Sequence, residues 1–314
     1  MKRVFDESHS IITFATNKLK YVQFAFNCAE SVLLHNDIKI FIVSNLEFSI
    51  PPGLQKNVSV VKAKEEHTAL GIGIKLYIDR YQQTRHSLFI DSDCLCFAAL
   101  QPIFSACNDK HVSAAGTVID AAEWVGKQQA DIIEKEFGLK QLPRFNGGLY
   151  YLEKSEKTTE IFDMARSIVP EYDRLGFARI NNKWVNEEGL IAIAMAKHTE
   201  TPIPDDGSYM TDLYTDPHPR KLNVLKGIRV LNNPAVGNPG HRPWYPEGNY
   251  SPIIIHFGGN NLSSYIYKSQ VLLLRLYKMR IGKNLASSAV DIFFHLPIKS
   301  LRWIIGSLRN LKTS

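Results

Sequence analysis

The sequence lacks the long apolar segments that would carry a chain across a membrane. No uninterrupted apolar run reaches the ~18 residues of a spanning helix, and the N-terminus turns quickly acidic and polar. We therefore expect neither a signal peptide nor an N-terminal membrane anchor. Internal repeats and low-complexity stretches are also missing. With 314 residues, 45% hydrophobic and 22% charged, the composition predicts a globular protein with one large core or two smaller ones.

Cysteine is scarce and shows no disulfide pattern. The four cysteines, Cys28, Cys94, Cys96 and Cys107, lack the spacing of a secreted framework. They predict reduced, buried thiols in a cytoplasmic protein. Cys94 and Cys96 have the spacing of half a zinc site, but no second pair completes it.

The main body of the chain has no excess of positive charge, and the net positive charge is concentrated at the end of the chain. Residues 268–314 hold nine Lys or Arg against one acid, which gives +8, so the other 267 residues carry −2 of the net +6. This distribution argues against nucleic acid as a partner and favours an anionic membrane surface that meets the tail. Residues 298–311 place apolar side chains at helical spacing, which predicts a helix in the interface at the inner face of a membrane. The alternative is a helix packed on the domain or on a partner subunit.

Hydrophobic periodicity predicts alternating strands and helices in the first third of the chain. The expected segments are strands over 11–15, 38–43, 58–61 and 87–91, with helices near 21–32 and 68–81. Such alternation with short connections predicts an α/β fold with a mainly parallel sheet flanked by helices. In such sheets ligands lie beyond the carboxyl ends of the strands.

The rest of the chain is less regular. We expect a strand over 144–152, a helix over 186–197, and a strand over 253–256. The strand over 144–152 is opened by Gly147-Gly148, a pair that either permits close approach of another group to the backbone or marks a bulge or turn. Between the last two lies a Pro- and Gly-rich region that is either an ordered functional loop or a mobile lid. We divide the chain into one domain over 1–262 and a basic, amphipathic helical tail over 263–314.

Two carboxylates follow the strand over 87–91 in the sequence Phe89-Ile90-Asp91-Ser92-Asp93. At the end of a strand, aspartates separated by one residue can both turn toward one cation. Oxygen ligands of this kind suit Mg²⁺ or Mn²⁺, which also bind phosphate oxygens of a substrate. The alternative is a solvated turn after the strand, because such a short motif is frequent by chance.

Further motifs occur in a fixed order between residues 10 and 260. They are Phe14-Ala15-Thr16-Asn17 with Tyr21, Lys75, Asp91-Ser92-Asp93, Phe145-Asn146-Gly147-Gly148, Glu187-Glu188-Gly189-Leu190, and His256-Phe257-Gly258-Gly259. Together they resemble the retaining glycosyltransferases of the GT-A fold, family 8, which includes glycogenin and bacterial lipopolysaccharide galactosyl- and glucosyltransferases. Ordered agreement over this length is more specific than any single motif.

The resemblance implies a Rossmann-like GT-A domain that moves a hexose from a nucleotide sugar, expected to be a UDP-sugar, to a saccharide acceptor. It implies Mn²⁺ or Mg²⁺ as the cofactor, held by Asp91, Asp93 and His256. Glu187 and Glu188 are the catalytic candidates beside the anomeric carbon. The implied donor-binding residues are Ala15, Thr16, Asn17, Tyr21, Lys75, Ser92, Asn146, Gly147 and Gly259. Together with the basic tail, this implies a lipid-linked acceptor such as a growing lipopolysaccharide or capsule unit.

The chain departs from the family pattern at two places. Glu188 stands where the family usually has glutamine, and Asn260, Asn261 and Leu262 replace the usual lysine and tryptophan after His-x-x-Gly. Two other functions remain open. One is a phosphohydrolase or phosphotransferase with a DxD nucleophile, although such enzymes usually carry the motif near the chain start. The other is a non-catalytic sugar-binding protein of the same fold, against which the three implied metal ligands argue.

Overall fold

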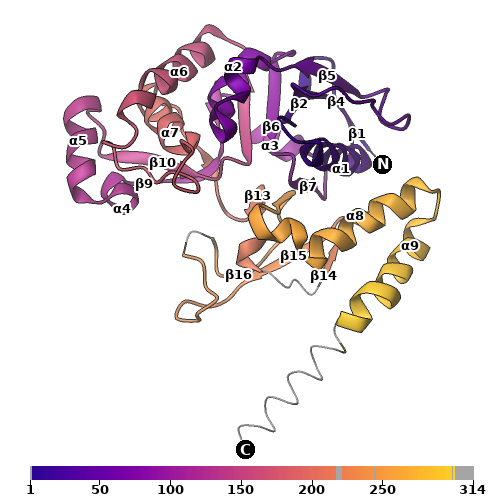
Figure 1. Cartoon of the computed structure of the whole chain (residues 1–314). Helices are drawn as coiled ribbons and strands as arrows, with labels where there is room; N and C mark the ends of the chain where they lie inside the picture. The colour runs from indigo at the N-terminus through magenta and orange to yellow at the C-terminus, as the bar shows by residue number, and fades with distance from the viewer. Residues whose placement is uncertain (1, 217–220, 244, 299, 301–314) are drawn as a thin grey trace, which may run out of the picture.

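A six-stranded mixed sheet forms the centre of the molecule (Figure 1). The structure, a computed structural model, describes residues 2–216, 221–243, 245–298 and 300. In spatial order the strands are β5 (Val58–Lys62), β4 (Lys39–Ser44), β2 (His9–Phe14), β6 (His86–Ile90), β11 (Leu149–Glu153) and β8 (Val112–Ser113). The first four run parallel, and β11 runs antiparallel to both of its neighbours. The predicted α/β fold with a mainly parallel sheet is confirmed.

Helices cover both faces of this sheet because successive side chains of a strand point to opposite sides. Ile11 packs in a buried cluster with residues of α1 (Leu19–His35) and α3 (Gln101–Ala106), whereas Ile12 packs in the cluster on the other face. That second cluster draws on η1 (Gly71–Tyr81), α5 (Lys127–Phe137), α6 (Glu156–Ser167) and α7 (Glu187–Lys197). Two buried faces explain the near-continuous apolar runs of the central strands.

The segment 144–152, expected as one strand, is divided between two strands. It forms β10 (Gln141–Phe145), which pairs with β9 (Ala115–Asp120), and β11, which joins the central sheet. Gly147 and Gly148 separate the two strands. A Cβ atom on Gly147 would lie 2.3 Å from Glu187 Oε1, and one on Gly148 would lie 2.9 Å from Asn146 Oδ1. The glycine pair therefore marks a turn where other groups approach the backbone closely.

The expected helix over 68–81 is also irregular. A short helix α2 (Glu65–Thr68) precedes η1, which is a 3₁₀-helix interrupted at Tyr77 by non-helical backbone angles. Gly71 begins η1 with φ of 62°, a left-handed conformation that ends the preceding turn. Lys75 of η1 reaches the end of β6, where its Nζ lies 2.6 Å from Asp91 Oδ2.

A second region lies beside the main sheet and is formed largely by the C-terminal part of the chain. Its strands are β7 (Cys94–Cys96), β13 (Met210–Asp212), β14 (Lys221–Asn223), β15 (Ile228–Asn233), β16 (Gly248–Tyr250) and β17 (Ile254–His256). Figure 1 shows α8 (Tyr265–Lys278) and α9 (Lys283–Val290), in orange and yellow, next to these strands. Leu95, Ile255, Phe257 and Leu273 belong to their shared core. The described residues of the Pro- and Gly-rich region form β13 to β16 and their connections.

Short elements complete the described chain. They are β1 (Arg3–Val4), β3 (Asn36–Asp37), α4 (Ala121–Val125), η2 (Val169–Glu171), β12 (Ile203–Pro204), η3 (Leu213–Thr215), η4 (Gly259–Ser263) and the π-helix η5 (Asp291–His295).

The first helix of the predicted tail, α8, packs on α1. Asn27 Nδ2 donates a hydrogen bond to Tyr267 Oη at 3.1 Å, and Lys278 Nζ lies 2.5 Å from Glu30 Oε1. The boundary at residue 262 remains a prediction, and the predicted interfacial helix over 298–311 falls almost entirely outside the described residues. Among the helices that are described, none has both the length and the hydropathy to cross a bilayer.

Candidate active site

A pocket of about 510 Å³ lies beyond the carboxyl ends of the central parallel strands. This volume is in the range of pockets that hold small organic ligands. Its walls come from the ends of β2 and β6, the turn between β10 and β11, the start of α7 and the end of β17. The predicted site residues that line it are Thr16, Asn17, Tyr21, Lys75, Asp91, Ser92, Asp93, Asn146, Gly147, Glu187, Glu188, His256 and Gly259.

Ala15 is the predicted site residue that does not line the pocket. Its side chain is fully buried in the core at the end of β2. The adjacent Asn17 does line the pocket, with φ of 67°. Its amide group donates to the carbonyl oxygen of Thr68 at 3.0 Å and accepts from Asn45 Nδ2 at 3.1 Å. Asn17 therefore ties the end of β2 to the segments at Asn45 and Thr68.

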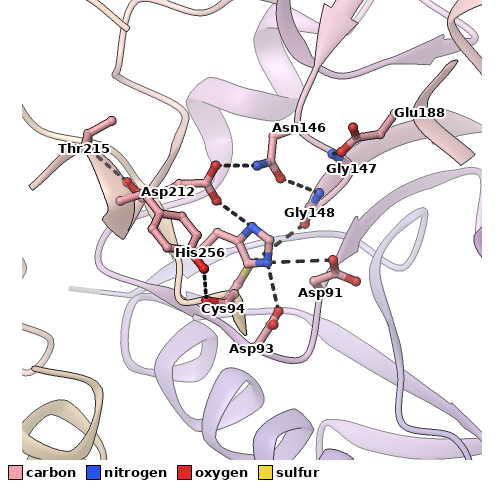
Figure 2. A network of polar contacts seen from close by, with 12 residues as sticks. Asp91, Asp93, Cys94, Asn146, Gly147, Gly148, Glu188, Asp212, Thr215 and His256 are labelled. Carbon is pink, nitrogen blue, oxygen red and sulfur yellow. Dashed lines mark hydrogen bonds and ion pairs between the residues drawn. The ribbon is translucent and has the colours of Figure 1, made fainter. Parts of the chain in front are cut away.

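The three predicted metal ligands meet through the pairing of β17 with β7. The antiparallel register puts His256 opposite Cys94, next to Asp93. His256 Nε2 lies 3.1 Å from Asp93 Oδ1 and 4.0 Å from Asp91 Oδ2 (Figure 2). Ligands ~2.0–2.6 Å from one ion are separated by distances of this order. Two carboxylates and an imidazole nitrogen are also donors that Mn²⁺ and Mg²⁺ accept, so the residues fit such an ion.

The charge balance of the pocket supports the same conclusion. Five carboxylates, from Asp91, Asp93, Glu187, Glu188 and Asp212, belong to one network of contacts, which also holds the cationic Lys75 and the titratable His256. Anionic groups gathered in a partly buried pocket are costly unless a cation joins them. A divalent cation would reduce the excess.

A cysteine sulfur also lies at this point. One ligand atom each of Asp93, Cys94 and His256 lie within 4.8 Å of one another. Burial raises the pKa of the Cys94 thiol well above its usual value, and the nearby aspartates raise it further. The sulfur therefore remains a protonated, buried neighbour of the oxygen and nitrogen donors.

Lys75 joins the metal side of the pocket to the glutamates. Its Nζ lies 2.6 Å from Asp91 Oδ2, 2.9 Å from the carbonyl oxygen of Gly147 and 3.4 Å from Glu187 Oε1. Burial lowers the pKa of Lys75, but Asp91 and Glu187 raise it by more, so the amine stays protonated. Burial raises the pKa of Asp91, whereas Lys75 lowers it in part.

The two glutamates begin α7 in different environments. Glu187 is 1% exposed, and Tyr150 Oη donates to its Oε1 at 3.3 Å. Burial raises the pKa of Glu187 to about 7, although Lys75 opposes the shift. Glu188 accepts hydrogen bonds from the backbone N–H of Gly147 at 2.7 Å and from Asn186 Nδ2 at 3.0 Å. Its pKa is raised by burial and lowered in part by these donors.

Asp212, which no sequence motif indicated, lies beside Nδ1 of His256, the ring nitrogen that faces away from Asp91 and Asp93. Asp212 Oδ1 lies 2.8 Å from His256 Nδ1, a short contact whose alignment is poor for a hydrogen bond. Burial lowers the pKa of His256, but Asp93 and Asp212 raise it by more, to well above its usual value. Asp212 ends β13, which pairs in parallel with β17 and places Asp212 beside His256. A lone aspartate in a Pro-rich region gave no signal of this pairing.

Comparison with known proteins places the chain by its fold. No protein-family model and no curated protein sequence matches it. An active-site mutant of LgtC, in which glutamine is replaced by glutamate, is 15% identical, with TM-score 0.51 over 80% of this chain and 87% of its own. LgtC, a galactosyltransferase, in complex with donor and acceptor sugar analogues is 14% identical, with TM-score 0.48 over 80% and 87%. Mouse xyloside xylosyltransferase 1 is 10% identical, with TM-score 0.47 over 81% and 98%.

The first of these matches bears on the fold. At 15% identity it shows the fold and leaves the substrates open. The chain thus has the GT-A fold of glycosyltransferases, as the sequence motifs predicted. Its structural similarity to LgtC agrees with the fold that those motifs predicted.

Proposed function

We propose that this protein is a metal-dependent, retaining glycosyltransferase that moves a hexose from a UDP-sugar to a saccharide acceptor. The observation that carries the proposal is one pocket of a GT-A fold in which Asp91, Asp93 and His256 lie beside Lys75 and the two glutamates. These are the groups that transfer from a nucleotide sugar needs: cations for the departing diphosphate and carboxylates for the sugar.

Asp91, Asp93 and His256 would hold Mn²⁺ or Mg²⁺ at the end of β6. When bound, the ion would act as a Lewis acid on the diphosphate oxygens and neutralise the charge that develops there. Lys75 supplies a second, fixed positive charge beside Asp91. Ser92 and Gly259 line the pocket on this side.

The sugar would lie against the turn between β10 and β11. Gly147 and Gly148 line the pocket there, and having no side chains they let Glu187 and His256 lie directly against the turn, within reach of a bound sugar. In the transfer, the bond from the anomeric carbon to the diphosphate breaks, and a bond to the acceptor oxygen forms on the same face of the sugar, either directly or after a covalent bond to Glu188. The proton of the acceptor hydroxyl passes to the departing diphosphate, and the product keeps the anomeric configuration of the donor. Glu187 and Glu188 stand at this turn, where a carboxylate stabilises positive charge on the anomeric carbon.

The end of the described chain supports a further part of the proposal, which is peripheral binding to an anionic membrane. Large apolar side chains are exposed there at Leu285, Ile292, Phe293 and Leu296, with exposures of 67%, 53%, 79% and 54%. Exposed basic residues accompany them at Arg275, Arg280 and Lys283. A surface that combines apolar and basic side chains suits the interface of an anionic bilayer. Lipid-linked saccharides of lipopolysaccharide or capsule, at the cytoplasmic face, are the acceptors we propose.

Calorimetry with nucleotides tests the central proposal. We expect UDP to bind more tightly than ADP or GDP, and excess EDTA to weaken that binding at least about tenfold, because a divalent ion held by Asp91, Asp93 and His256 would neutralise charge on the diphosphate. A UDP-sugar panel followed by NMR of the product then identifies the sugar and the anomeric outcome. Nucleotide affinity that is the same with Mn²⁺ and with EDTA would contradict the proposal. Hydrolysis of phosphate monoesters without any sugar transfer would contradict it as well.

A further inference from the structure

Asp212 makes contacts with both halves of the candidate active site. Its Oδ1 lies 2.8 Å from His256 Nδ1, and its Oδ2 accepts a hydrogen bond from Asn146 Nδ2 at 2.7 Å. Figure 2 shows Asp212 between these two residues, with His256 turned toward Asp91 and Asp93. One carboxylate thus holds the imidazole on the metal side and the amide on the sugar side.

Asn146 connects Asp212 to the glycine turn through hydrogen bonds. Its Oδ1 accepts a hydrogen bond from the backbone N–H of Gly148 at 2.8 Å, while its Nδ2 is occupied by Asp212. Gly148 also lies against the imidazole, since a Cβ atom added there would be 3.2 Å from His256 Nδ1. The position of Asp212 therefore affects the backbone that we place against the sugar.

A third donor comes from the Pro-rich region. Tyr245 Oη lies 3.2 Å from Asp212 Oδ2, and the Tyr245 side chain is buried, with 7% exposure. The backbone around Tyr245 is itself held, because Asn233 Nδ2 donates to the carbonyl oxygens of Arg242 and Tyr245. Asp212 is thus held by a hydrogen bond from Tyr245, a residue that does not line the pocket.

We infer that Asp212 is a positioning residue that orients His256 for a divalent ion and couples that ion to the Asn146–Gly148 turn, with Tyr245 fixing Asp212. Metal-binding histidines commonly depend on such a carboxylate behind the ring, whose loss weakens metal binding by about 10- to 100-fold. This inference rests on the metal-dependent function proposed above. It assigns a role to a region that the sequence left as either a loop or a lid.

The substitution Asp212→Asn tests the inference sharply. A carboxylate can accept a hydrogen bond on each oxygen, whereas an amide has one oxygen and one NH₂ group. Whichever way the amide is turned, its NH₂ group faces either the Nδ1 side of His256 or the NH₂ group of Asn146. When Nε2 of His256 binds an ion, Nδ1 carries the proton and needs an acceptor. The amide can then satisfy both neighbours only if Asn146 turns over and loses its hydrogen bond from the Gly148 N–H, so one contact of the series breaks while the shape of the side chain is unchanged.

Mn²⁺ affinity, measured from the EPR signal of the free ion, is the readout. We expect Asp212→Asn to weaken Mn²⁺ binding by about 10- to 100-fold, and Tyr245→Phe to weaken it less, by several-fold. The control is Asp206→Asn, which removes an exposed aspartate from the same region, where its carboxylate accepts from the Ser208 N–H. UDP binding in EDTA should change far less than Mn²⁺ binding, a difference that a general loss of structure would not produce.

The outcomes separate the two proposals. Wild-type protein that does not bind Mn²⁺ would overturn the proposed metal dependence itself. Wild-type protein that binds Mn²⁺ while both Asp212→Asn and Tyr245→Phe bind it equally well would overturn the role of Asp212 alone. If Asp212→Asn does not fold, Tyr245→Phe decides, because it removes only a hydroxyl group and should still weaken Mn²⁺ binding.

Discussion

Lys75 Nζ and Asp91 Oδ2 lie 2.6 Å apart, so one of the candidate metal ligands already has a cationic partner from the protein. Glu187 shares the same ammonium group at 3.4 Å. Lys75 and Glu187 are both buried, and a lysine in such a place is a structural counter-ion as well as a candidate donor contact. This double role leads to the first prediction.

The substitution Lys75→Met should destabilise the protein most when no divalent ion is present. It keeps much of the side-chain volume but leaves Asp91 and Glu187 without their cation, a loss of roughly 3–5 kcal/mol for a buried pair. Mn²⁺ should restore more of the Tm in this variant than it adds to the wild type, because the ion takes over the neutralisation of Asp91. Thermal unfolding with Mn²⁺ and with EDTA checks this. A variant as stable as wild type in EDTA would contradict it.

The substitution Glu188→Gln addresses the mechanism. If the carboxylate stabilises the anomeric carbon or attacks it, the amide should lower kcat by at least about 100-fold while UDP-sugar binding stays within a few-fold. Steady-state kinetics and calorimetry measure the two effects separately. A mild loss of kcat would instead favour front-face transfer without a carboxylate nucleophile. NMR showing inversion in the product would refute retention altogether.

The buried Glu187 predicts a specific pH dependence of stability. Burial raises the pKa of its carboxyl from 4.5 to about 7, so the folded state binds this proton more tightly than the unfolded state does. Its contribution to stability is complete below pH 4.5 and is lost as pH rises to about 7. The loss is at most ~1.4 kcal/mol per pH unit. In Glu187→Gln this part of the pH dependence should vanish, which a series of Tm measurements will show.

The control for this measurement is Glu123→Gln on α4, because Glu123 is exposed. That substitution should leave the curve of Tm against pH parallel to the wild-type curve. A Glu187→Gln curve that also stays parallel would place the Glu187 pKa near its ordinary value.

Membrane binding should depend on the apolar side chains at the end of the described chain. Phe293→Asp combined with Leu296→Asp should lower the protein's affinity for anionic vesicles at least about tenfold, since each buried large apolar side chain contributes about 1.5–3 kcal/mol. Co-sedimentation with vesicles containing phosphatidylglycerol measures this affinity. Val236→Asp is the control, because Val236 is 76% exposed in a different region. Equal sedimentation of all three proteins would rule out this surface.

The sequence predicted much of the fold because its strands are short, apolar and close together along the chain. The strands that became β2, β4, β5 and β6 were identified to within a few residues, as was α7, which was expected over 186–197. The break inside 144–152 was predicted only as one of two alternatives, because both halves have strand-like composition and the Gly147-Gly148 pair fits a bulge or turn as well as a close approach to the backbone. Only the close approach of Glu187 to Gly147 shows why the chain must turn there.

The candidate site was predicted in part for a similar reason. Motifs that are contiguous, such as Asp91-Ser92-Asp93, can be recognised from their spacing. Asp212 and Tyr245 could not, because their place beside His256 depends on the pairing of β13 with β17 and on a contact across the Pro-rich region. Pairing between distant short strands leaves little trace in one sequence.

The pairing of β17 with β7 has a consequence for biosynthesis. His256 follows Asp93 by more than half the length of the 314-residue chain, so the candidate metal site joins an early and a late segment. A ribosome adds residues in order, and the first strands of the main sheet emerge long before β17 does. A nascent chain that stops short of His256 can form the parallel strands but not the complete ligand set. Capture of a divalent ion would then report that nearly the whole GT-A domain has been made.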